Sequence, residues 1–209
     1  MTALNLVHRV RLPPGEKVQL LPAVVLVHGW TGTENSMQIF HPALPPGVVA
    51  VSPRGPIVAE EGYGWLDRQA AGDLAYAAGM EALQEFVSRL PAVYPVDPAR
   101  VVLMGFSQGA AMSLALMLKE PGLVAGTAAL AGYLPAFARG WALPARLTGK
   151  PVFMAHGAED TTVPLAEAAS AKEVLSLAGA EVTYCEYLTG HKMNQQGMQD
   201  LKQWLAGHV

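Results

Sequence analysis

Three residues in the second half of the chain have the types needed for nucleophilic catalysis: Ser107, Asp160 and His191. A serine hydroxyl is a weak nucleophile at neutral pH and needs a general base within hydrogen-bond reach. Histidine has the intrinsic pKa to take that proton and return it to a leaving group. A carboxylate must then hold the imidazole in the useful tautomer. We therefore predict Ser107 as nucleophile, His191 as base and acid, and Asp160 as the residue that orients His191.

Ser107 is the centre of a G-x-S-x-G pentapeptide, residues 105–109. The apolar run before it, residues 101–104, is typical of a buried strand, and the Ala/Leu/Met-rich run after it, residues 110–117, is typical of a helix. A serine at such a turn must accept a strained backbone, and the flanking glycines remove side chains that would collide there. The helix N-terminus also offers amide N–H groups to a developing oxyanion. Without this context the pentapeptide would indicate only a flexible turn.

The acid and the base are both predicted in loops that follow strands. His191 lies between the last predicted strand and the last predicted helix, and Asp160 follows the apolar run at residues 151–155. Asp160 is preferred over the adjacent Glu159 because it directly precedes residues 161–164, the start of a helix that would anchor the loop. Asp160 could alternatively serve only as a helix cap. The order serine, acid, histidine is that of the α/β-hydrolase arrangement.

Strands and helices alternate along most of the chain, which predicts an α/β fold: a mostly parallel sheet covered by helices on both faces. An opening hairpin is predicted from residues 4–12 and 17–20, and a helix stopped by Pro91 from residues 67–90. The other expected strands are 23–27, 48–51, 101–104, 126–131, 151–155 and 182–187. The other expected helices are 34–40, 110–117, 164–178 and 193–206.

Ligands bind outside the carboxyl ends of the strands in such sheets. The residues that closely follow a predicted strand, and so belong on this rim, are His28, Arg54, Ser107, Asp160 and His191. We interpret His28 and His156 as structural histidines at strand ends. Arg54 is interpreted as a structural loop contact, with binding of an anionic substrate group as the alternative.

The composition limits the class of protein. The 209 residues fit one domain, residues 1–209, and 51% hydrophobic with 15% charged residues exclude disorder. A net charge of -3 gives no reason to expect nucleic acid or an anionic membrane as partner. Cys185 is the only cysteine, so neither an intramolecular disulfide nor a Cys-rich zinc pattern is possible. With neither a signal peptide nor an apolar run of about 18 residues, we expect a soluble cytoplasmic protein without stable membrane insertion. The oligomeric state is not predicted.

Several motifs together resemble the phospholipase/carboxylesterase family of α/β hydrolases, which includes bacterial carboxylesterases and acyl-protein thioesterases. Residues 105–112 are similar to its G-F-S-Q-G-[GA]-A-[ML] motif, residues 157–164 to its G-x-x-D-x-x-V-P motif, and residues 190–191 to its G-H motif. Residues 52–56 and 132–135 also match runs of that family. The resemblance extends over about residues 24–205.

The resemblance implies hydrolysis of esters or thioesters through an acyl-Ser107 intermediate, with no metal or organic cofactor. It also implies an oxyanion hole made by the backbone N–H groups of Trp30 and Gln108, each worth on the order of 3 kcal/mol. The chain departs from the family at Trp30 and Thr31, where a smaller or aliphatic residue and a glycine are common. The Trp30 ring could narrow the acyl pocket or stack on the substrate, or could instead be packed into the core.

An apolar substrate pocket is predicted from side chains on the rim loops. These residues are Trp30, Tyr63, Trp65, Leu66, Val163 and Met193. Residues 132–149 show no clear period and are interpreted either as a lid over this pocket or as a packed surface loop. The leading hypothesis is a serine esterase or thioesterase for small to medium acyl chains. The alternatives are a lactone hydrolase like the dienelactone group, which has cysteine where Ser107 stands, and a catalytically silent binding module on the same fold.

Overall fold

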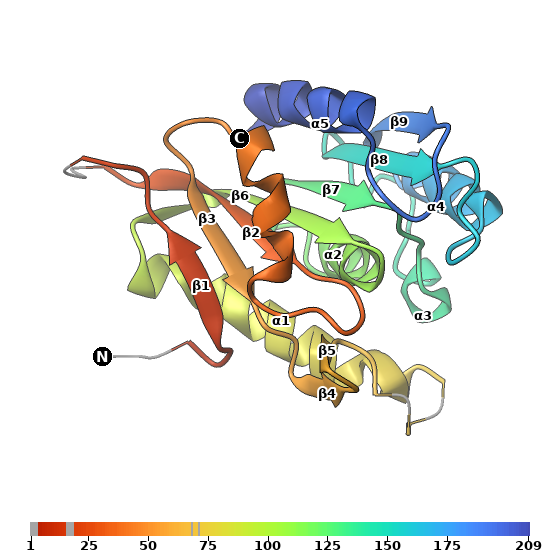
Figure 1. Cartoon of the computed structure of the whole chain (residues 1–209), viewed down its shortest axis with the longest axis horizontal. Helices are drawn as coiled ribbons and strands as arrows, with labels where there is room; N and C mark the ends of the chain where they lie inside the picture. The colour runs from red at the N-terminus through yellow and green to blue at the C-terminus, as the bar shows by residue number, and fades with distance from the viewer. Residues whose placement is uncertain (1–3, 16–18, 68, 71) are drawn as a thin grey trace.

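A seven-stranded sheet in the order β1-β3-β2-β6-β7-β8-β9 forms the centre of the molecule (Figure 1). It is seen in a computed structural model that describes residues 4–15, 19–67, 69–70 and 72–209. The strands are β1 (His8–Arg11), β2 (Leu21–Val27), β3 (Val49–Pro53), β6 (Val96–Phe106), β7 (Gly126–Leu130), β8 (Pro151–Gly157) and β9 (Glu181–Tyr187). All neighbours in this sheet pair in parallel except β1, which is antiparallel to β3. The predicted α/β class and mostly parallel sheet are confirmed.

The two faces of the sheet carry separate apolar cores because successive strand residues point to opposite sides. On β2, Val25 and Val27 belong to one core, and Val24 and Leu26 to the other. The first core is covered by α1 (Leu74–Val93), α2 (Gln108–Lys119) and α4 (Leu165–Leu177). The second is covered by α5 (Gln195–His208) and the short 3-10 helix η1 (Ser36–Ala43), and Figure 1 shows α5 lying along β8 and β9. No helix in the described part of the chain is long and apolar enough to cross a bilayer.

The predicted opening hairpin is wrong. β1 pairs with β3, with Val10 opposite Val51, and Gln19 and Leu20 of the second predicted strand are not in a strand. The next strand, β2, cannot accept β1 because both its edges are occupied by β3 and β6. Lys17 and Val18, which begin the second predicted strand, lie outside the described residues. β3 therefore lies between β1 and β2 in the sheet, although β1 and β2 are consecutive in the chain. The order of elements along the chain does not reveal this arrangement.

Other predicted boundaries shift for local reasons. α1 runs past Pro91 to Val93, and the Tyr94 N–H donates to the Leu90 carbonyl at 2.9 Å, so the proline does not end the helix. β6 begins at Val96 rather than at residue 101, since Val96 pairs with Leu21. A two-stranded hairpin, β4 (Ile57–Ala59) and β5 (Gly62–Gly64), forms in a stretch predicted as loop.

Residues 132–149 are packed against the body of the molecule. They contain the short helix α3 (Ala136–Arg139), and Leu134, Ala138 and Leu147 are buried. The Phe137 ring lies 4.9 Å from that of Tyr76 on α1. Residues 132–149 are therefore packed on the surface of the molecule in this structure, and their role as a lid stays a prediction.

Candidate active site

Ser107 occupies the sharp turn between β6 and α2, as the pattern of its neighbours predicts. Its φ is 54° and its ψ is -118°, a conformation that an L-residue adopts only under strain. The turn is held because the Ser107 N–H donates to the Leu130 carbonyl on the neighbouring strand at 2.8 Å. The serine is thus raised at the carboxyl end of the sheet, beside the first turn of α2.

Gly105 and Gly109, on either side of Ser107, are required because the backbone around them leaves no space for a side chain. A Cβ on Gly105 would overlap the backbone of Gly109, and a Cβ on Gly109 would overlap the carbonyl oxygen of Val27. α2 is therefore pressed against the ends of β2 and β6 more closely than any side chain at these positions allows. This close approach fixes where the Ser107 hydroxyl can lie.

Asp160 and His191 are joined directly. The His191 Nδ1 lies 2.6 Å from Oδ2 of Asp160, whose side chain is fully buried. The other oxygen, Oδ1, accepts from the backbone N–H groups of Thr162 at 2.8 Å and Val163 at 2.9 Å. Burial opposes ionisation of the carboxyl, but the hydrogen bonds from Val163, His191 and Thr162 outweigh it and lower the pKa of Asp160. Asp160 is therefore an anion at neutral pH.

The backbone brings the loops of these two residues together. The Ala158 N–H donates to the Tyr187 carbonyl at 2.8 Å, and the Glu159 N–H donates to the Thr189 carbonyl at 3.0 Å. A Cβ on Gly157 would overlap the carbonyl oxygens of Thr189 and Gly190, so a larger residue there would push the loops apart. Glu159, the alternative acid, is exposed on this loop, whereas Asp160 points inward. The geometry thus favours Asp160 as the partner of His191.

Two further histidines support the strand ends. The buried His156 uses Nε2 to donate to the Val163 carbonyl at 2.8 Å, and this atom also lies 3.5 Å from Oδ2 of Asp160. Nε2 of His28 accepts from the Gly55 N–H at 2.9 Å, and burial lowers the pKa of His28. Both positions agree with the structural role predicted for them.

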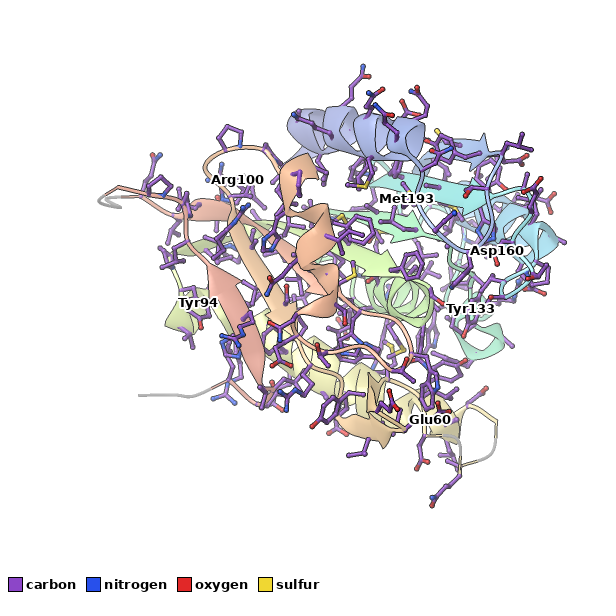
Figure 2. All side chains as sticks on the ribbon, in the orientation of Figure 1. Glu60, Tyr94, Arg100, Tyr133, Asp160 and Met193 are labelled. Carbon is purple, nitrogen blue, oxygen red and sulfur yellow. The ribbon has the colours of Figure 1, made fainter. Side chains whose placement is uncertain are left out.

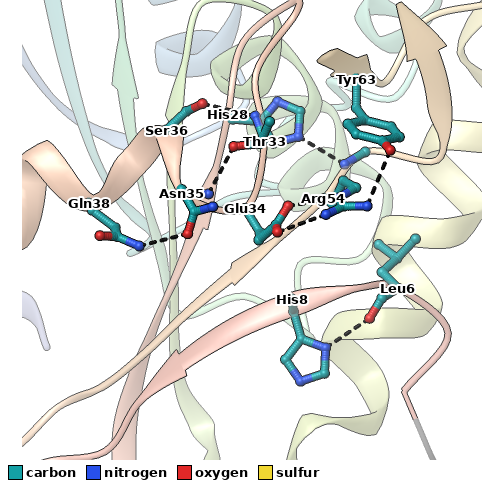
Figure 3. A network of polar contacts seen from close by, with 11 residues as sticks. Leu6, His8, His28, Thr33, Glu34, Asn35, Ser36, Gln38, Arg54 and Tyr63 are labelled. Atoms are coloured by element: carbon teal, nitrogen blue, oxygen red, sulfur yellow. Dashed lines mark hydrogen bonds and ion pairs between the residues drawn. The ribbon is translucent and has the colours of Figure 1, made fainter. Parts of the chain in front are cut away.

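Arg54 is held in a structural contact between two loops (Figure 3). Its guanidinium bonds both carboxylate oxygens of Glu34, at 2.7 and 2.8 Å, and lies 4.5 Å from the centroid of the Tyr63 ring. The hydrogen bonds from Arg54 lower the pKa of Glu34 to about 2. This arrangement matches the first interpretation of Arg54 and leaves its charge already paired with a carboxylate.

Ser107 and His191 line one cavity of about 780 Å³. Trp30 and Met193, both predicted to contact substrate, also line it. The cavity is mostly apolar, and the sequence analysis did not identify Met37, Ile39, Phe40, Phe106 and Met198 as part of its wall. The missed residues come from η1, the end of β6 and the first turn of α5, which meet only in the folded chain. Figure 2 shows Asp160 and Met193 at the end of the molecule toward which the parallel strands point, away from Arg100.

Trp30 and Gln108, the two predicted oxyanion donors, lie in the loop after β2 and at the start of α2. As a first-turn residue, Gln108 has an N–H without an acceptor inside its own helix. Its side-chain Oε1 accepts from the Trp65 N–H at 2.8 Å. The Trp30 ring covers Gly64, where a Cβ would lie 2.5 Å from the ring carbon Cε3.

The remaining predicted substrate contacts lie elsewhere. Trp65 is fully buried in the core, and its Nε1 donates to the His28 carbonyl at 3.0 Å, so it does not reach the cavity wall. Tyr63 packs on Arg54, and neither Tyr63 nor the half-buried Leu66 is among the described residues lining the cavity. Val163 lines a neighbouring cavity of about 740 Å³ instead. The sequence placed Tyr63 and Trp65 on a rim loop but did not reveal the β4–β5 hairpin that contains Tyr63 and directly precedes Trp65.

Known proteins resemble this chain in sequence. Residues 17–209 match the model of a family described as Phospholipase/Carboxylesterase. A probable carboxylesterase SOBER1-like of Arabidopsis thaliana is 31% identical over 114 residues, which are 53% of this chain and 43% of the relative. Esterase YpfH of Escherichia coli K12 is 39% identical over 100 residues, 46% of this chain and 40% of the relative. The matched segments thus span less than half the length of each of these relatives.

Known structures resemble the fold of this chain over nearly its whole length. The crystal structure of a Bacillus cereus carboxylesterase superimposes with a TM-score of 0.86 at 23% sequence identity, covering 98% of this chain and 95% of that one.

Proposed function

This chain belongs to the phospholipase/carboxylesterase family of α/β hydrolases, and from that premise we propose that it is a serine hydrolase of carboxylic esters or thioesters with small to medium acyl chains. One observation carries the proposal. A buried carboxylate holds His191 at 2.6 Å, and His191 lines the same cavity as a serine on a strained turn. These are the parts that acyl transfer through a serine requires.

The proposed reaction begins with attack of the Ser107 hydroxyl on the carbonyl carbon, while Nε2 of His191 takes the hydroxyl proton. The carbonyl oxygen becomes an oxyanion, which the backbone N–H groups of Trp30 and Gln108 would stabilise. The tetrahedral intermediate then collapses, His191 gives its proton to the leaving oxygen or sulfur, and the acyl group stays on Ser107. Water attacks this acyl-enzyme with His191 again as base, which releases the carboxylic acid and restores the serine.

Asp160 has a positioning and electrostatic role in this scheme. Its bond to Nδ1 of His191 leaves Nε2 as the nitrogen that can exchange a proton with the serine. Because its pKa is lowered, Asp160 stays negative throughout the neutral range and stabilises the imidazolium that forms when His191 is protonated. Asp160 itself need not change its protonation state.

The cavity favours an uncharged, mainly apolar acyl group. A volume of about 780 Å³ lies within the usual range for small-molecule sites. Among the described residues that line it, Lys192 is the only charged one. An ester and a thioester with the same acyl group present the same acyl half of the substrate to this cavity, so the proposal includes both.

We also propose a cytoplasmic location. The sequence has a single cysteine, Cys185, so the fold does not depend on an intramolecular disulfide. A reducing compartment such as the cytoplasm is therefore compatible with the fold.

The direct test is hydrolysis of a p-nitrophenyl ester series from acetate to octanoate by the wild type and Ser107→Ala. We expect kcat/KM to fall by more than about 10³-fold in Ser107→Ala, because removing the nucleophile leaves only binding and oxyanion stabilisation. Ser113→Ala is the matched control, since Ser113 is buried in α2, the helix that follows Ser107, and its hydroxyl donates to the Gly109 carbonyl at 2.8 Å. Absence of hydrolysis by the wild type, or full activity in Ser107→Ala, would contradict the proposal.

A further inference from the structure

A glycine near the start of α5 leaves room for a side chain that lines the cavity. A Cβ on Gly197 would lie 2.8 Å from Cε of Met193 and 3.1 Å from Cε2 of Tyr187. Gly197 is buried, and its N–H donates to Oδ1 of the helix cap Asn194 at 2.8 Å, so its place in the helix is fixed. The methyl group of Met193 therefore occupies space that any larger residue at position 197 would take.

Met193 and Tyr187, the two neighbours of Gly197, differ in how freely their side chains can move. The Tyr187 hydroxyl donates to Oδ2 of Asp200 at 2.7 Å, and Gln196 donates to Oδ1 of the same carboxylate at 2.8 Å. This anchors the tyrosine ring at both its backbone and its hydroxyl. Met193 has an unbranched, flexible side chain and lines the cavity of Ser107. We therefore expect added volume at position 197 to move the flexible Met193 side chain, which lines the cavity, more than the anchored Tyr187 ring.

The wall that contains Met193 is continuous with the core on the α5 side of the sheet. Cavity residues Met37 and Phe40 belong to that buried cluster, and Phe106, Met193 and Met198 pack against it. A methylene chain laid on this wall would extend the core and gain the free energy of apolar burial. The acyl group stays bound through both steps of the reaction, whereas the leaving group departs after the first. An apolar wall therefore suits the acyl half of the substrate.

We propose that Met193, seated against Gly197, sets the acyl-chain preference, and that linear acyl groups of medium length lie along Met193 and Met198. The inference rests on the proposed hydrolase function and adds the part of the cavity that holds the chain. Gly197 acts as a specificity-determining position without lining the cavity itself. Its lack of a side chain keeps Met193 withdrawn and the acyl site long.

The test compares p-nitrophenyl esters of increasing acyl length in the wild type and in Gly197→Ala. We expect the octanoate-to-acetate ratio of kcat/KM to fall about tenfold, because a site that loses room for one or two methylenes loses about that factor in discrimination. Removal of the obstructing side chain should cancel the effect, so the Met193→Ala/Gly197→Ala double variant should have the ratio of Met193→Ala alone. Gly207→Ala, a substitution on the same helix with open space around it, should keep the wild-type ratio.

Three results would overturn the inference. The first is an unchanged ratio in folded Gly197→Ala, and the second is a fall in the ratio that persists in the Met193→Ala background. The third is found with alkyl acetates of increasing alcohol length: if Gly197→Ala changes only the preference for alcohol length, the cavity holds the leaving group and not the acyl chain. If thermal melting shows that Gly197→Ala does not fold, Met193→Phe replaces it, and the same fall in ratio is required. Wild-type hydrolysis of the whole ester series separates the two proposals. If the wild type hydrolyses no ester of the series, acetate to octanoate, the hydrolase function is removed, whereas hydrolysis without a chain-length effect of Gly197→Ala removes only this inference.

Discussion

Ser107 holds a backbone conformation that its own side chain disfavours. Its φ of 54° is maintained by the strand before it, by the helix after it and by the hydrogen bond from its N–H to Leu130. Such strain costs on the order of 1–3 kcal/mol and persists only where the surrounding structure enforces it. Here it raises the hydroxyl to the rim of the cavity that also contains His191. The strain at Ser107 therefore supports the catalytic role that we propose for it.

This link predicts opposite effects on stability and activity. Ser107→Gly should raise the free energy of unfolding by about 1 kcal/mol, since glycine adopts positive φ without a Cβ clash, while ester hydrolysis is lost. Urea denaturation measures the first effect and ester hydrolysis the second. In the control Ser113→Gly, where a buried helical serine is replaced, the free energy of unfolding should fall by about 1 kcal/mol. A destabilised Ser107→Gly would show that the turn is not strained in solution.

At the scale of elements, side-chain contacts join the loops after β2 and β3. Glu34 comes from the first loop and Arg54 from the second, and their two hydrogen bonds bridge the elements. His28 adds a third connection by accepting from the Gly55 N–H. We infer that these contacts fix the loop whose N–H is proposed to stabilise the oxyanion.

The Glu34–Arg54 pair gives a pH-dependent prediction. The pKa of Glu34 is lowered to about 2 from an ordinary value of 4.5, so the pair stabilises the fold fully above pH 4.5 and loses that contribution as the pH falls toward 2. Glu34→Gln should therefore lower the free energy of unfolding at pH 7 by about 1–2 kcal/mol. The difference from the wild type should shrink between pH 4.5 and 3. Denaturation curves at pH 7, 5 and 3 measure it, and a difference independent of pH would contradict the assigned role.

The sequence was most accurate for elements whose structure is determined by residues close together in the chain. The turn at Ser107 follows from an apolar strand, two glycines and a helix within one short stretch, and steric contacts at Gly105 and Gly109 agree with it. The cavity wall could not be predicted in the same way. Met37 and Met198 come together because η1 and α5 pack on one face of the sheet, which no local pattern specifies. Trp65 shows the same limit, since an aromatic residue in a loop-like stretch became part of the core.

At the scale of the whole molecule, the parallel sheet gathers residues that are far apart in the chain. Ser107 follows β6, Asp160 follows β8 and His191 follows β9, so the strand ends bring three distant segments to one rim. The two strand-end loops that carry the acid and the histidine are then joined by backbone hydrogen bonds. This arrangement explains why alternation of strands and helices was sufficient to predict that these residues lie on one rim of the sheet, although it did not predict β1 beside β3.

The central claim is that an acyl group is transferred to Ser107, and the most direct measurement is the intact mass of the protein quenched in acid during turnover of p-nitrophenyl butyrate. We predict a species heavier than the free protein by one butyryl group, with the added mass located by peptide analysis on Ser107. It should be absent from Ser107→Ala and present in Ser113→Ala. Steady hydrolysis by the wild type without any acylated species on Ser107, or with the acyl group on another residue, would contradict the account.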